Sequence, residues 1–171
     1  MKSDWRVYGK KADFKRLADK YSIDQVIARI IRNRDICGDS DIDMYLNGDI
    51  KDMHAPKDMK DAVVSVDIIE KKIKEKCRIR IIGDYDIDGI CSIYILYKGL
   101  LAAGADVDYV VPHRINDGYG INEHLIDNAL SDGIDTIITC DNGLSAYSQV
   151  KYAKDNGMTV IFTDHHDVPF D

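Results

Sequence analysis

The second half of the chain constrains the fold most, because short β-branched runs alternate there with amphipathic segments. From Arg78 onward, four such runs are separated by stretches of helical periodicity near residues 90–103, 122–131 and 144–156. Strands that alternate with helices are typical of repeated β-α-β units, which form parallel sheets. The sequence therefore predicts an α/β fold with a doubly wound (Rossmann-like), mainly parallel sheet flanked by helices. The predicted strands are residues 79–82, 107–111, 136–139 and 159–162.

The first part of the chain has a different pattern and predicts mostly helix. Apolar residues recur at helical spacing in residues 23–32, Ser40 is a candidate helix cap, and a longer helix is expected over residues 57–76. We therefore expect two parts, an N-terminal helical region packed on the core and the α/β core itself. Their expected bounds are residues 1–76 and 77–171.

Composition excludes several classes of protein. The net charge of −7 argues against a protein whose whole surface attracts nucleic acid. No apolar run is long enough to span a bilayer, and the first residues lead into no signal-peptide core, so we expect a cytoplasmic protein with no membrane partner. The four cysteines occur singly, without a C-x-x-C pair, and are expected to be reduced core thiols. They are Cys37, Cys77, Cys91 and Cys140.

A polar segment directly follows each of the four predicted strands. Ligands of open parallel sheets bind beyond the carboxyl ends of the strands, so we expect these four segments to meet at one edge of the sheet. Scattered surface charges would not be expected to keep this register four times. The segments are residues 84–89 (DYDIDG), 114–120 (RINDGYG), 141–143 (DNG) and 164–166 (DHH).

Three carboxylates occur at alternate positions in the first segment, at Asp84, Asp86 and Asp88. Packing these carboxylates together without a counter-charge costs roughly several kcal/mol, and a bound cation removes that cost. Their oxygens suit Mg²⁺ or Mn²⁺, and adding the imidazole of His165 or His166 shifts the preference toward Mn²⁺. The alternatives are helix caps, solvated turn residues or a calcium loop. The calcium loop is the weakest of these, because its twelfth position is Ile95 rather than an acid.

The other segments add candidate ligands and substrate contacts. Asp164 and the two histidines after it combine groups that ligate a metal and orient a ligand, although a histidine pair alone is weak evidence. Asp141 is placed to bridge two metals, although a lone Asp-Asn-Gly is usually a turn. Arg114 offers a guanidinium for phosphate, and Gly118 and Gly120 let the backbone approach a ligand, unless this loop is only structural. Tyr119 either stacks on a base or packs.

Two close metals with a bridging carboxylate fit the hydrolysis of a phosphate ester. The metals activate water and neutralise phosphoryl oxygens, and a nearby histidine assists proton transfer. The sequence contains no Walker loop or G-x-G-x-x-G, so a nucleotide-binding domain lacks its fingerprint.

These residues resemble the DHH phosphoesterase superfamily and, within it, the RecJ branch of single-strand DNA exonucleases. Residues 84–90, 141–143 and 164–166 are similar to the first, second and third motifs of that branch. Further similar segments are residues 33–34, 54–56 and 117–122, and the resemblance extends from about residue 27 to residue 167.

The resemblance implies a 5′-to-3′ exonuclease that hydrolyses phosphodiester bonds of single-stranded DNA in DNA repair and recombination. It also implies a cofactor of Mn²⁺ or Mg²⁺ in a two-metal site. Asp84 is implied to be a ligand or an acid that orients one, His166 to transfer a proton or contact phosphate, and Asp164 to orient. The implied firm metal ligands are Asp86, Asp88, Asp141 and His165. Asp141 also has an implied catalytic role. The candidate substrate contacts are Arg114, Gly118, Tyr119 and Gly120.

The sequence departs from the family pattern in two places. The family continues past the third motif to another metal-binding aspartate and a second domain, whereas this chain ends at Asp171. We therefore expect the N-terminal part of a longer enzyme, which folds, binds the second metal poorly and has little or no nuclease activity alone. The family also commonly has Cys where Asn142 stands, and nothing in the sequence explains this change.

Two other functions compete with the exonuclease. One is a DHH phosphodiesterase that acts on short oligonucleotides or cyclic dinucleotides, which would share the metals but not the long helical region. The other is a non-catalytic DNA-binding subunit, against which the intact set of motifs argues.

Overall fold

The computed structural model describes the chain except for residues 1–3, 5, 7, 116, 119 and 167–171. The chain divides into two compact units, Met1–Asp58 and Met59–Asp171, and each is described by itself. Among the described residues, no helix has the length and apolar composition needed to cross a bilayer.

The first unit is a small group of helices around a few buried side chains. Aspartates cap two of the helices, because Asp13 accepts a hydrogen bond from the Arg16 amide and Asp24 accepts one from the Val26 amide. The expected cap Ser40 lies inside a helix instead, since the chain enters that helix at Gly38 and acids occupy its first turn. The elements are α1 (Phe14–Tyr21), α2 (Gln25–Asn33), α3 (Asp39–Asn47) and the 3₁₀ turns η1 (Ile50–Asp52) and η2 (Pro56–Asp58).

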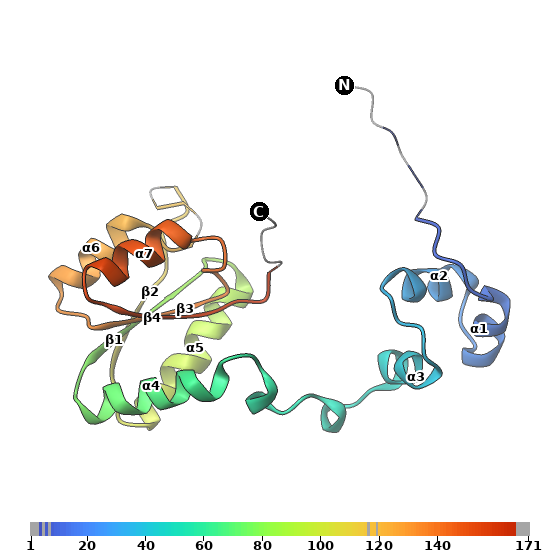
Figure 1. Cartoon of the computed structure of the whole chain (residues 1–171), viewed down its shortest axis with the longest axis horizontal. Coiled ribbons are helices and arrows are strands. Elements are labelled where there is room, and N and C mark those ends of the chain that lie inside the picture. The colour runs from blue at the N-terminus through green and yellow to red at the C-terminus, as the bar shows by residue number, and fades with distance from the viewer. Residues whose placement is uncertain (1–3, 5, 7, 116, 119, 167–171) are drawn as a thin grey trace. The chain divides into compact units, whose positions relative to one another are not determined.

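The second unit is a four-stranded, wholly parallel sheet with the strand order β2-β1-β3-β4. Helices alternate with the strands along the chain, as the β-branched runs predict, and the α/β fold class is confirmed (Figure 1). The strands are β1 (Arg78–Gly83), β2 (Asp106–Val110), β3 (Thr136–Cys140) and β4 (Thr159–Thr163), and the helices are α4 (Ala62–Lys74), α5 (Ile87–Ala102), α6 (Glu123–Ser131) and α7 (Tyr147–Asp155).

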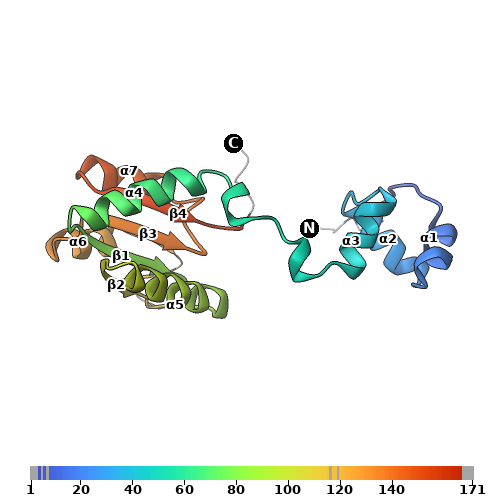
Figure 2. The ribbon, with the colours of Figure 1, turned by 90° about the horizontal axis from the view of Figure 1, so that it is seen from below.

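Helices cover both faces of this sheet. Alternate side chains of a strand point to opposite faces, so Ile79 and Ile81 pack with α4 and α5, whereas Ile82 packs with α6 and α7. In Figure 1 these helix pairs lie on opposite sides of the strands, and in Figure 2 α4 and α5 lie in front of them. The sheet is therefore the middle layer of three, with an apolar core on each face.

The two compact units divide after Asp58, while the expected domain bounds, residues 1–76 and 77–171, stay a prediction. The helix expected over residues 57–76 begins only at Ala62, because η2 occupies the first residues and Asp61 has a left-handed backbone with φ of 58°. Ile68, Ile69 and Ile73 of α4 pack on the sheet, so this helix belongs to the second unit. The packing of the N-terminal helical region on the core stays a prediction.

A buried charge occurs on the central strand β1 at Arg80, which is 7% exposed. Its guanidinium donates to both carboxylate oxygens of Asp108, at 2.8 and 2.7 Å, and lies 2.9 Å from the Asp132 carboxylate. This fork satisfies the charge and ties β1 to β2 and to the residue that ends α6.

Candidate metal centre

The register of the sheet places three acids in one row. Gly83 pairs with Cys140, and Cys140 pairs with Thr163, so the next residues on three neighbouring strands are Asp84, Asp141 and Asp164. The neighbours β1 and β3 lead into helices on opposite faces of the sheet, and a crevice opens at such a switch point. The acidic row therefore lies where α/β proteins bind their ligands.

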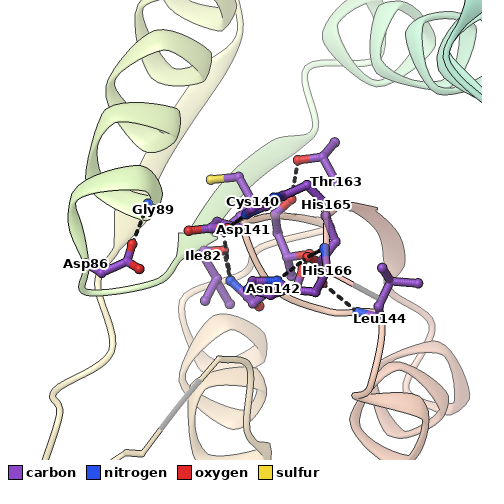
Figure 3. Close-up of polar contacts among 12 residues, drawn as sticks. Ile82, Asp86, Gly89, Cys140, Asp141, Asn142, Leu144, Thr163, His165 and His166 are labelled. Atoms are coloured by element: carbon purple, nitrogen blue, oxygen red, sulfur yellow. Dashed lines mark hydrogen bonds and ion pairs between the residues drawn. The ribbon is translucent and has the colours of Figure 1, made fainter. Parts of the chain in front are cut away.

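Asp141 and the two histidines after β4 form the tightest group of potential ligands (Figure 3). One ligand atom from each of Asp141, His165 and His166 lies within 4.8 Å of the others. His165 Nε2 is 2.9 Å from Asp141 Oδ1, and the carboxylate is buried while both imidazoles are exposed. A carboxylate and two imidazoles in this arrangement provide the donors that Mn²⁺ and related metals prefer.

Asp84 and Asp86 add carboxylates beside this group. Asp84 is 3% exposed, and its Oδ1 is buried with no hydrogen-bond partner among the described residues. Asp86 caps α5, and its Oδ1 accepts a hydrogen bond from the Gly89 amide at 2.9 Å. Burial and then the nearby charge of Asp86 raise the pKa of Asp141 above its usual value of 3.8, despite the opposing effect of His165. Negative charge thus accumulates at this edge of the sheet, which favours a cation there.

Asp164 fixes the ring of His166. The Asp164 carboxylate accepts hydrogen bonds from the Leu144 amide at 3.0 Å and from the His166 amide at 3.1 Å, and its Oδ1 is 2.7 Å from His166 Nδ1. Burial raises the pKa of Asp164, but these donors outweigh it and bring the pKa below 3.8. The same contact raises the pKa of His166 above 6.5. A carboxylate on Nδ1 assigns the proton of the neutral ring to that nitrogen and leaves Nε2 basic.

The structure brings only some of the predicted site residues close to the group of Asp141, His165 and His166. Asp88 is exposed in the first turn of α5 and is not among the three residues of the compact ligand group. Arg114 places its guanidinium 5.3 Å from the ring centroid of Tyr85, which brings the loop after β2 beside the first acidic segment. Gly118 and Gly120 both have left-handed backbones, with φ of 76° and 70°. The predicted contact Tyr119 lies outside the described residues.

Residues that the sequence interpretation missed hold this loop and the turn after β3. The Asp117 carboxylate accepts a hydrogen bond from the His113 amide at 2.7 Å and closes the loop. Asn142 is 1% exposed, whereas the sequence predicts only a tight turn at Asn142 and Gly143 beside the candidate ligand Asp141. An Asn-Gly pair has the composition of an exposed turn, so no sequence signal indicates its burial.

The cysteines match their prediction only in part. All four are free, and burial raises the pKa of the Cys140 thiol to about 11. However, Cys37 and Cys91 are exposed, so the expectation of four core thiols is wrong for these two. Cys91 is exposed on the mainly apolar helix α5, whose buried side chains are Ile93 and Leu100.

Comparisons with known proteins show what this chain is similar to. Two proteins called single-stranded-DNA-specific exonuclease RecJ are similar in sequence. The Bacillus subtilis (strain 168) protein is 32% identical over 97% of this chain and 21% of its own length, and the Salmonella typhimurium protein is 41% identical over 60% and 18%. This chain therefore spans about a fifth of the length of these relatives.

Solved structures are similar as well. A crystal structure of exonuclease RecJ bound to manganese matches with a TM-score of 0.59 and 35% identity, over 63% of this chain and 28% of that one. A structure of RecJ in complex with Mn²⁺ from Thermus thermophilus matches with a TM-score of 0.61 and 27% identity, over 77% and 19%. The model of the family described as DHH family, N-terminal domain, matches residues 78–171, which are more than half of the chain. The chain thus belongs to the DHH family.

Proposed function

We propose that this chain carries the metal-binding part of a divalent-metal-dependent exonuclease that hydrolyses single-stranded DNA from its 5′ end. The observation that carries the proposal is the row of Asp84, Asp141 and Asp164 at the switch point, with His165 and His166 beside it. The similar proteins named single-stranded-DNA-specific exonuclease support the substrate. The proposal includes action in DNA repair and recombination, and a cytoplasmic location.

The donor set fits Mn²⁺, with Mg²⁺ as the alternative. Asp84 Oδ1 is a buried acceptor without a described partner, and such an atom is costly unless a cation or a donor satisfies it. Carboxylate oxygens suit both ions, while imidazole nitrogen favours Mn²⁺. Both similar RecJ structures are complexes with manganese, which supports the same choice.

Each acidic side chain has a distinct proposed role. Asp86, Asp141 and His165 hold the metal, with Asp84 as a ligand or an orienting acid and Asp88 as a further ligand. When bound, the metal ions supply water activation and neutralise the charge on the phosphoryl oxygens. Asp141 is the proposed bridge between two ions, because β3 lies between β1 and β4 in the sheet.

His166 is the proposed proton-transfer residue. Asp164 and the Leu144 amide fix the ring, so that Nε2 is the nitrogen that accepts or donates a proton at the scissile phosphate. An imidazole titrates closest to physiological pH among side chains, which suits it to both directions of transfer, and the Asp164 contact raises the pKa of His166. Asp164 acts only through His166.

The loop after β2 is the proposed substrate side. Arg114 contacts a phosphate, Tyr119 contacts a base, and Gly118 and Gly120 allow the backbone to approach the strand. Arg114 over Tyr85 lies next to the acidic segment, as a phosphate contact near the scissile bond requires.

Binding of Mn²⁺ to this chain tests the metal centre. The free Mn²⁺ signal in electron paramagnetic resonance should fall on addition of the chain, and Asp86→Ala or Asp141→Ala should prevent this. Asp67→Ala is the matched control, since Asp67 is an exposed acid on α4 of the same unit. Absence of Mn²⁺ binding by the unaltered chain would overturn the proposal.

Degradation of 5′-accessible single-stranded DNA tests the reaction. We expect weak or no activity from this chain, because it spans about a fifth of its relatives, and any activity should require Mn²⁺ and Asp86. Robust degradation by these residues alone would refute the expected incompleteness of the centre. Hydrolysis confined to cyclic dinucleotides would replace the proposed substrate.

A further inference from the structure

Asn142 is a buried polar residue to which the proposed metal centre assigns no role, and it belongs to none of the apolar clusters. Its Nδ2 donates hydrogen bonds to the carbonyl oxygens of Ile82, at 3.2 Å, and Cys140, at 3.0 Å (Figure 3). Both partners only accept, so they determine which end of the amide is nitrogen. The side chain therefore connects the carboxyl ends of β1 and β3, the two strands that flank the switch point.

The residue before it has an uncommon backbone. Asp141 has φ of 62°, in the left-handed region, which persists in a residue other than glycine when the surroundings hold it. The Asp141 amide donates to the Thr163 carbonyl at 2.9 Å, which ties the turn to β4. Asn142 is the next residue, so its two hydrogen bonds hold the turn from the opposite side.

Thr139 completes the support. Its hydroxyl donates to the backbone carbonyl of Asn142 at 2.7 Å, and its own carbonyl accepts from the Thr163 hydroxyl at 3.0 Å. Thr139 is 0% exposed, so this bond is shielded from water. The peptide and the carboxamide of Asn142 are thus both fixed.

We propose that Asn142 is a positioning residue: its carboxamide holds the left-handed backbone of Asp141 and so aims the Asp141 carboxylate at the metal. This inference rests on the proposed function, which makes Asp141 a ligand. Asn142 is assigned no contact with the reacting atoms, and the effect of its carboxamide on the metal passes through Asp141.

Asn142 also supports the substrate loop. A Cβ added at Gly120 would lie 3.4 Å from Asn142 Cβ and 3.5 Å from its Oδ1, so the glycine packs directly against this side chain. The same residue therefore contacts the turn that carries Asp141 and the loop that follows β2. Its Oδ1 is buried without a hydrogen-bond partner among the described residues, which leaves only the Nδ2 bonds to fix the amide.

The test measures Mn²⁺ affinity and residue-resolved amide exchange in this chain. Asn142→Ala should weaken Mn²⁺ binding by about 10-fold or more, as loss of groups that orient ligands typically does. Without metal, exchange of the Asp141 amide should accelerate by about 10-fold or more, while the amides of Ile137 and Ile138 in the same strand keep their protection. Asn156→Ala is the matched control, because Asn156 donates to the Tyr152 carbonyl far along α7 and should change neither reading.

A second pair of variants covers a failure of Asn142→Ala to fold. Thr139→Val removes the hydroxyl that holds the Asn142 peptide and should weaken Mn²⁺ binding in the same direction, while Thr139→Ser retains the hydroxyl and should restore it. Unchanged Mn²⁺ affinity and unchanged Asp141 exchange in Asn142→Ala and Thr139→Val would overturn the inference. If the unaltered chain binds no Mn²⁺, the proposed function fails, and the exchange of Asp141 still decides whether Asn142 holds its backbone.

Discussion

Residues 1–58 and residues 59–171 bury their apolar side chains in different ways. Among the described residues, the first unit has one cluster of four buried side chains, whereas the second has nine on each face of its sheet. The first unit also carries exposed ion pairs, such as Lys20 with Asp39, while the second has the buried fork of Arg80. The residues of the proposed metal centre all lie in the second unit, so the unit with the larger core is the one that accommodates buried like charges.

Truncation of a central core residue should have the largest effect. Ile138→Ala, at a side chain that is 1% exposed, should lower the unfolding free energy of residues 59–171 by about 4 kcal/mol, because it removes buried methyl groups and leaves a cavity. Urea unfolding followed by residue-resolved amide signals measures this. Signals of residues 1–58 should keep their midpoint, and a common shift of both units would break the comparison. Ile95→Ala, at a 70% exposed position in the same unit, is the control.

Metal binding should stabilise one unit and not the other. Mn²⁺ at 100 times its dissociation constant should raise the unfolding free energy of the second unit by about 2.7 kcal/mol, because only the folded form binds it. The midpoint of residues 1–58 should stay constant. Thermal unfolding with and without Mn²⁺, read separately for each unit, checks this, and Asp141→Ala should abolish the increase.

The ion pairs of the two units should contribute differently to the free energy of unfolding. Asp108→Ala should cost about 2 kcal/mol, since it leaves the buried Arg80 with only Asp132 as a charged partner among the described residues. Lys20→Met in the first unit should change the unfolding free energy by no measurable amount, because its pair with Asp39 is exposed to water. Urea denaturation of both variants gives the contrast, and equal costs would contradict it.

The smallest effect concerns the pKa of one histidine. Asp164→Asn should lower the pKa of His166 toward 6.5, because the carboxylate contact is what raises it. The pair stabilises the fold mainly between about pH 3.8 and 6.5: the His166 contribution is lost as pH rises through its raised pKa, and that of Asp164 as pH falls through its lowered pKa. Titration of the His166 ring by nuclear magnetic resonance measures the change. A pKa that stays raised in the variant would assign the shift to other acids.

Much of the second unit follows from the sequence, because strands of a parallel sheet that is covered on both faces are rich in apolar, β-branched residues. The runs ending at Ile82 and Thr139 predict strand ends within one residue of the observed ones, Gly83 and Cys140. The acids after them are predictable since parallel strands end at one edge. Strand order is not, because a crossover helix fits on either side of β1.

Helix boundaries and supporting residues were harder to predict. The expected helix over residues 57–76 starts late because Asp61 adopts a left-handed backbone, and periodicity does not report such a local break. Asn142 was missed because its burial depends on β1 and on Gly120, which are distant in sequence. Propensity describes single segments, whereas this support depends on several segments that meet only in the folded chain.

The alignment of Asp84, Asp141 and Asp164 has a consequence for changes in chain length. The pairing of β1, β3 and β4 fixes how many residues lie between the middle of each strand and its acid. One residue of a strand spans about 3.3 Å, and successive side chains point to opposite faces of the sheet. Deleting one residue within β3 would therefore turn Asp141 toward the opposite face, even if every apolar contact were repaired. Insertions in the loops before the strands leave the number of residues between the middle of a strand and its acid unchanged. Related sequences should thus vary in length at the amino ends of β1, β3 and β4, and keep the distance from the middle of each strand to its acid constant.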